Sequence, residues 1–141
     1  MAAATTTPPS TTVRPTTVRR IGTAAAIVGG VALIAKVALA AVTAGAAPSA
    51  AFSVLYLVGT TLPLVAAAGI ASARRRRSTM IATYAAVVFA HLFYIMTLSE
   101  AVEGVVGLFT DKLYLTEEIP LAVLGLIWLI VGLNMRAHDR A

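Results

Sequence analysis

The sequence predicts an all-α integral membrane protein in which four transmembrane helices form an antiparallel bundle. Three observations lead to this prediction: only 12% of the residues are charged, 59% are hydrophobic, and four consecutive arginines separate two long uncharged stretches. No charged side chain occurs from Val37 to Ala73 or from Ser78 to Ser99. A soluble domain would carry about 25% charged residues. Most of the surface is therefore expected to face lipid.

The chain begins with a segment rich in Ala, Thr, Pro and Ser, residues 1–18. Few of its side chains are large and apolar, so it cannot bury enough surface to fold. We expect a disordered cytoplasmic tail there, followed by a single four-span membrane domain over residues 19–141.

The first span is predicted at about 21–44 and is apolar except for Lys36. Small residues support helix packing in lipid because they let two backbones approach closely. At the helical period, one row of this span presents mostly small side chains, and a second row overlaps it. The first row is Gly22, Ala25, Gly29, Ala32 and Lys36, and the second is Gly22, Ala26 and Gly30. Ordinary bundle packing and self-association are the two uses left open for these rows.

The second span is predicted at about 50–73, after a short uncharged turn at residues 47–49. Pro63 lies near its middle and is expected to kink the helix, because proline removes one backbone hydrogen bond. A small-residue face is expected here too, made of Gly59, Pro63, Ala66 and Ala67.

The third and fourth spans are predicted at about 78–99 and 119–135. The external connector over residues 100–118 is expected to continue the third span and then to lie at the membrane interface. Pro120 is placed in the first turn of the fourth span, where its missing N–H is harmless. Gly125 and Gly132 supply the small face of this span. Trp128 falls at mid-span, where it either packs between helices or faces lipid or a partner subunit.

The arginine run Arg74, Arg75, Arg76 and Arg77 predicts the orientation, because basic clusters beside a span stay in the cytoplasm. If this turn is cytoplasmic, four spans place both termini in the cytoplasm. The expected location is a plasma membrane, and the arginine-rich composition favours a bacterial inner membrane. The run serves to fix topology or to contact anionic lipid head groups. Asp139 is then the one acid on the cytoplasmic side. The external side receives the other five, namely Glu100, Glu103, Asp111, Glu117 and Glu118.

One alternative topology comes from Ala44-Gly45-Ala46, which resembles a signal-peptidase site. Cleavage after Ala46 would leave three spans with the same sidedness. The apolar run before it is longer than a signal h-region and contains Lys36, which favours retention as a span.

Lys36 is the candidate for an intramembrane polar site, because it lies about 24 Å beyond Arg20 along a helix. It either snorkels to the external head groups or faces the bundle interior and pairs with an acid. Glu100 and Glu103 are the acids predicted to lie at similar depth.

His91 and Tyr94 share one face of the third span and complete this candidate site. His91 is predicted either to hydrogen-bond a carbonyl or hydroxyl of a neighbouring helix or to join a proton relay. No other span contains a histidine, so no haem, metal or other cofactor is expected.

The functional prediction is a small non-catalytic membrane protein, an accessory or assembly subunit of a larger membrane complex. Catalytic motifs and phosphate loops are absent from the sequence, so an enzyme is not favoured. The basic residues flank apolar spans, which argues against a nucleic-acid partner. The expected partners are the bilayer and either a protein or further copies of the chain. The alternative is a small oligomeric transporter or solute-binding protein that uses Lys36, His91 and the outer glutamates.

Overall fold

The computed structural model describes residues 15–46 and 49–139, and the prediction of an all-helical four-span bundle is confirmed. The elements are α1 (Pro15–Thr43), α2 (Ser49–Ala71), α3 (Arg77–Phe93), a π-helical turn η1 (Tyr94–Leu98), α4 (Ser99–Gly107) and α5 (Leu113–His138). α3, η1 and α4 form one continuous span, so four helices are long and apolar enough to cross a membrane. The predicted tail lies mostly outside the described residues, and α1 begins at Pro15, earlier than expected.

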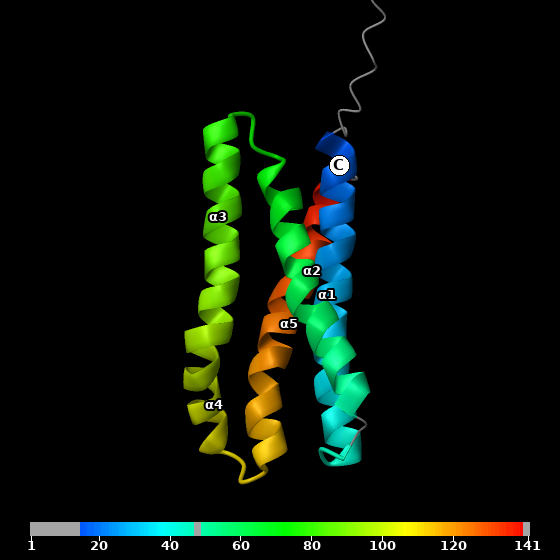
Figure 1. Ribbon diagram of the computed structural model, residues 1–141, viewed down its shortest axis with the longest axis vertical. Coiled ribbons are helices and arrows are strands. Elements are labelled where there is room, and N and C mark those ends of the chain that lie inside the picture. Colours follow the sequence, from blue (N-terminus) through cyan, green and yellow to red (C-terminus); the bar gives the residue numbers. More distant parts are fainter. Residues whose placement is uncertain (1–14, 47–48, 140–141) are drawn as a thin grey trace, which may run out of the picture.

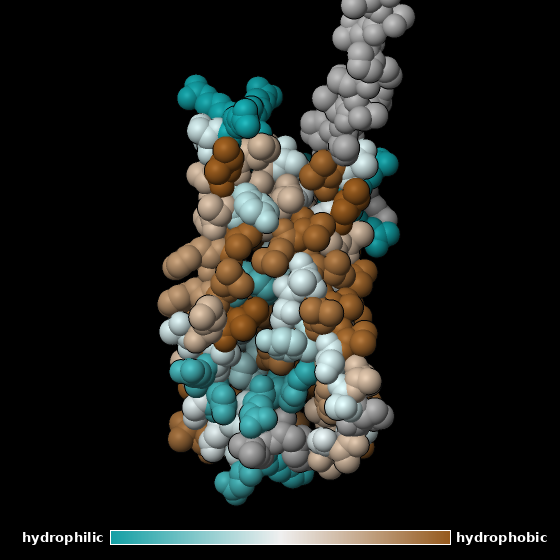
Figure 2. Space-filling view, in the orientation of Figure 1, coloured by the Kyte–Doolittle hydropathy of each residue, from teal (hydrophilic) through white to brown (hydrophobic). Residues whose placement is uncertain are grey.

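Successive spans run in opposite directions, so the bundle has two distinct ends (Figure 1). One end holds the start of α1, the α2–α3 turn and the end of α5, and we call it the basic end. The other holds the α1–α2 and α4–α5 connections, and we call it the acidic end. Hydrophilic side chains gather at both ends, and the surface between them is mostly hydrophobic (Figure 2).

α1 is the central helix of the bundle and packs closely against both α2 and α5. A Cβ added at Gly22 would lie 2.6 Å from the Cα of Gly69 in α2. A Cβ added at Gly30 would lie 2.5 Å from the backbone oxygen of Gly125 in α5. The predicted small rows of α1 are thus both occupied within the chain, one by each neighbour.

The predicted small face of α2 is also confirmed as a packing surface, because Gly59, Pro63, Ala66 and Ala67 are all buried. Gly59 lies under Leu33, which is itself fully buried in the core. Pro63 packs against Gly29 of α1, where only a glycine leaves room for the proline ring.

α3 and α4 form the outer helix of the bundle, with α3 against α2 and α4 against α5. Only His91 is buried in α3, and α4 has no buried residue. α3 stands visibly apart from α1 (Figure 1). The bundle is therefore a tight three-helix core with one loosely attached span.

The connector over residues 100–118 continues the third span, as expected, because α4 runs to Gly107. The predicted start of the fourth span was wrong, since α5 already begins at Leu113. Pro120 therefore lies inside α5 and not in its first turn.

Ala44 and Gly45 end α1, since both have positive φ and the Gly45 N–H donates to the Ala40 oxygen at 2.9 Å. This is the left-handed termination common at helix C-termini.

Candidate functional site

Lys36 of α1 forms an ion pair with Glu118 of α5, and its Nζ donates to both carboxylate oxygens. The Lys36 residue is 8% exposed, so the side chain lies between helices and does not extend outward. The prediction of a bundle-facing lysine paired with an acid is confirmed, and the snorkelling alternative is wrong. The predicted partners Glu100 and Glu103 were also wrong, because α5 begins early enough to bring Glu118 into the bundle.

Two aromatic rings of α2 face the same ammonium group. Lys36 Nζ lies 5.2 Å from the ring centroid of Phe52 and 5.9 Å from that of Tyr56. Both distances are within the range of cation–π attraction. A single lysine therefore links α1 to α5 through its charge and to α2 through aromatic faces.

His91 of α3 lies at the centre of a second polar cluster. Its Nε2–H donates to the backbone oxygen of Thr60 in α2 at 3.0 Å, as a carbonyl can only accept. Its Nδ1 accepts from Trp128 Nε1–H of α5 at 3.1 Å, and the two rings meet edge to face at 5.6 Å. The predicted hydrogen bond to a neighbouring carbonyl is confirmed. With one nitrogen donating and the other accepting, the ring is held as a neutral imidazole of fixed tautomer.

Tyr94 continues this cluster one turn further along the chain. Its hydroxyl donates to the backbone oxygen of Pro120 in α5 at 2.8 Å, and the residue is buried. Tyr94 opens the π-helical turn, whose additional residue per turn changes the register of the residues that follow. Within the part of the chain that the structure describes, His91 and Tyr94 are thus the polar side chains that attach the outer span to the core.

The remaining predicted site residues do not join these clusters. Glu100 is exposed and Glu103 is half-buried, and both belong to α4 at the acidic end. Among the described residues, no hydrogen bond or ion pair connects Lys36 with His91, and no three His, Asp or Glu side chains gather as metal ligands. The five-residue site therefore resolves into two separate clusters and two outlying glutamates.

Arg74, Arg75, Arg76 and Arg77 are exposed at the basic end. A second ion pair lies at this end, between Arg19 of α1 and Asp139, which follows α5. α1 and α5 are thus joined by an ion pair near each end of their contact. Neither of the two ion pairs found in the described part of the chain involves an arginine of this run.

Sequence reasoning missed Glu118 and Thr60 as partners. Glu118 ends the charged stretch before the last apolar run, so hydropathy alone assigns it to a connector. Thr60 contributes only its backbone carbonyl, so its side chain carries no signal for this contact.

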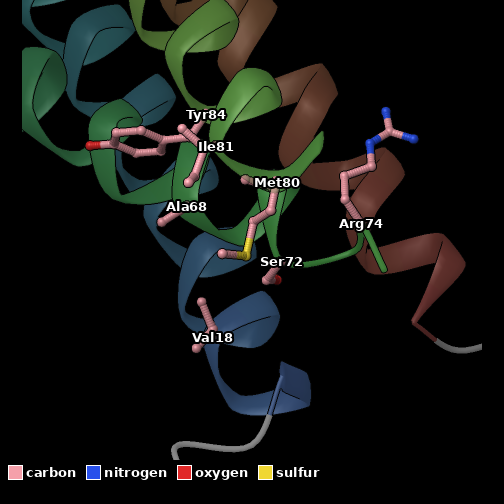
Figure 3. Close-up of a pocket in the computed structure, with 8 residues that line it drawn as sticks. Val18, Ala68, Ser72, Arg74, Met80, Ile81 and Tyr84 are labelled. Carbon is pink, nitrogen blue, oxygen red and sulfur yellow. The ribbon is translucent and has the colours of Figure 1, made fainter. Parts of the chain in front are cut away.

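Three cavities lie at the basic end, and none of these three is lined by Lys36 or His91. The largest of these three has a volume of about 570 Å³ and opens between α1, α2 and α3 (Figure 3). A comparison with models of protein families, with curated proteins and with solved structures finds no match for this chain.

Proposed function

We propose that this chain is a non-catalytic accessory or assembly subunit of a larger membrane complex and that α3 is the helix that docks against the partner. The observation that carries this proposal is an unpartnered row of small residues on α3. Four residues at four-residue spacing are all exposed on this helix: Ser78, Ala82, Ala86 and Ala90. Small residues at such spacing allow close helix contact in lipid.

The other small rows of the chain support this assignment by contrast. The rows on α1, α2 and α5 are buried against one another, as Gly22 against Gly69 and Gly30 against Gly125 illustrate. Alanine offers lipid little contact area, but it lets a second helix approach closely. The α3 row is therefore suited to a partner helix that lies outside this chain.

Two further features support a structural role. Each buried side-chain nitrogen or oxygen in the described part of the chain has a hydrogen-bond partner within it. Beside the small row, Phe89 and Phe93 are exposed and stacked, with ring centroids 5.9 Å apart. Rigid aromatic side chains of this kind frequently anchor helix–helix interfaces. We further propose that the basic end faces the cytoplasm of a bacterial cell, because arginine runs beside spans resist translocation.

A paired experiment tests the subunit proposal in native membranes. A photo-crosslinking residue placed at position 86 should yield one discrete adduct with another polypeptide, whereas the same residue at Ile130, exposed on α5, should not. Ala86→Leu should abolish co-purification of that polypeptide in mild detergent. Ala41→Leu, the same change at an exposed alanine of α1, should leave co-purification unchanged.

The proposal fails if position 86 crosslinks only to a second copy of the chain, or if Ala41→Leu and Ala86→Leu reduce co-purification equally. Either result would show that the α3 row is not a selective docking face for another protein.

A transporter is the second candidate, and the buried Lys36–Glu118 pair is the observation that favours it. Charged residues inside membrane spans often mark ion or substrate pathways. Cysteines introduced at positions 36 and 91 distinguish the two functions. Rapid labelling of both by a water-soluble thiol reagent in the intact membrane would favour transport, and slow labelling would favour the subunit function.

A further inference from the structure

The groove at the basic end has the shape and charge distribution of a site for an amphiphile. Its walls come from three helices and the turn after α2: Val18 of α1, Ala68 of α2, Ser72 directly after α2, and Met80 and Tyr84 of α3. Figure 3 shows the side chains of α3 facing those of α1 and α2 across it. Its volume of about 570 Å³ lies within the range typical of small-molecule sites, about 300–1,000 Å³.

Arg74 stands at the edge of this groove and gives it a charged rim. In Figure 3 its guanidinium points away from Met80 and Tyr84, so the apolar interior and the cation remain separate. Three more arginines follow it directly, and no ion pair of the described residues neutralises any of the four. A ligand that matches this arrangement has an apolar chain at one end and an anion at the other.

We propose that the groove binds one acyl chain of an anionic phospholipid whose phosphate lies beside Arg74. Guanidinium and phosphate form paired, charge-assisted hydrogen bonds, which favour arginine over other cations at such positions. The acyl chain fills the wedge that α3 leaves against α1 and α2, where an empty apolar volume would lose packing contacts. This site is independent of the small row of α3, so it goes beyond the proposed function.

The test measures lipid binding to the purified, delipidated full chain by native mass spectrometry. The probes are phosphatidylglycerol and phosphatidylcholine with the same acyl chains. We expect phosphatidylglycerol to bind at least about fivefold more tightly, the preference that one arginine at the membrane surface provides. Glycerol phosphate, which carries the anion without a chain, should not displace bound lipid at tenfold excess.

Two substitutions separate the charged part of the site from its apolar part. Arg74→Gln should lower phosphatidylglycerol affinity about fivefold and leave phosphatidylcholine affinity unchanged. Arg136→Gln is the matched control, because Arg136 lies at the same end but lines a different cavity, and it should change neither affinity. Ala68→Leu narrows the groove and should weaken both lipids about threefold or more, whereas Ala85→Leu, at an exposed position outside the lining, should not.

Helicity and monodisperse elution of each variant show whether it is folded. Ser72→Leu, which fills the same groove from the next turn, replaces Ala68→Leu if that variant misfolds. The proposal is overturned if the two lipids bind equally, if Arg136→Gln acts as strongly as Arg74→Gln, or if folded groove-filling variants bind lipid normally. Displacement by glycerol phosphate would also overturn it, since an anion site without an acyl chain would then account for the binding.

Discussion

At the scale of single residues, the polar side chains within the spans hold the helices together. His91 donates to Thr60 and accepts from Trp128, so one imidazole joins three helices. Lys36 likewise contacts Glu118 of α5 and two rings of α2. A buried polar group without a partner is costly, which makes each of these arrangements specific as well as stabilising.

The Lys36–Glu118 pair predicts a strong asymmetry between single and double substitutions. Lys36→Met alone leaves the half-buried Glu118 carboxylate without its partner and should lower the free energy of unfolding by about 3 kcal/mol. The double variant Lys36→Met, Glu118→Met removes both charges and should unfold with nearly wild-type stability. The measurement is SDS-induced unfolding in mixed micelles, followed by circular dichroism.

The neighbouring Glu117 provides the control for this pair, because it is exposed while Glu118 is half-buried. Glu117→Gln should change stability by less than about 0.5 kcal/mol. Exchange of the charges between Lys36 and Glu103 should give no rescue. Rescue there, or a double variant as unstable as Lys36→Met, would contradict the observed pairing.

The His91–Trp128 contact predicts measurable coupling in a double-mutant cycle. His91→Ala should destabilise the bundle by about 2 kcal/mol, since it removes two hydrogen bonds and leaves a cavity. Trp128→Phe should cost about 1 kcal/mol, and the coupling between the two changes should be at least about 0.5 kcal/mol. Leu126→Ala, at an exposed position on the same helix, is the control and should be nearly neutral. Strictly additive effects of the two changes would show that the side chains do not interact.

At the scale of helices, the rows of small residues decide which faces meet. Gly30 of α1 and Gly125 of α5 lie so close that neither position accommodates a Cβ. Gly104 of α4 has no neighbouring atom within 4 Å of an added Cβ. A helical glycine is thus required where another helix crosses it, as at Gly30, and is dispensable where no helix lies nearby, as at Gly104.

This contrast gives a prediction of opposite signs. Gly30→Ala should lower the free energy of unfolding by about 1–3 kcal/mol, because the added methyl forces α1 and α5 apart. Gly104→Ala should be neutral or stabilise the protein by up to about 1 kcal/mol, as alanine favours a helix more than glycine. SDS unfolding of the two variants, measured in parallel, checks both signs. Equal effects would mean that the α1–α5 crossing is not tightly packed.

The sequence was sufficient to predict the spans and their small-residue faces, because hydropathy and the helical period depend only on local composition. The burial of Gly59, Pro63 and Ala66 followed from this period alone. The partner of Lys36 did not follow, because Glu118 contacts it only if residues 113–118, which end in two glutamates, are helical. Hydropathy identifies the apolar part of a helix and cannot show how far its polar ends continue.

The contact between His91 and Trp128 illustrates a second limit. The sequence identified both as unusual residues within spans, but the relative rotation and height of two helices depend on packing over their full length. The loose attachment of α3 could not be predicted from the sequence for the same reason. Its composition resembles that of the other spans, and only the assembled bundle shows that its small row has no internal neighbour.

At the scale of the whole molecule, the bundle combines a closed core with an open outer span. α1, α2 and α5 bury their small rows and most of the core residues, while α3 is exposed along nearly all its length. The arginine run lies at one end and most of the acids lie at the other. Figure 2 shows hydrophilic residues at both ends and a mostly hydrophobic surface between them. This arrangement suits a protein that is anchored in one orientation and presents one helix to a partner.

A four-span topology with the basic end in the cytoplasm is the orientation that we propose, and the subunit function depends on it. It can be tested directly, because the sequence contains no cysteine and each single-cysteine variant has one reactive thiol. The positions are Ser78 and Ala137 at the basic end, and Ala46 and Leu108 at the acidic end, all exposed. A membrane-impermeant thiol reagent should label positions 46 and 108 in intact cells, and positions 78 and 137 only after the membrane is opened. Labelling of 78 or 137 in intact cells, or protection of either 46 or 108, would contradict this topology.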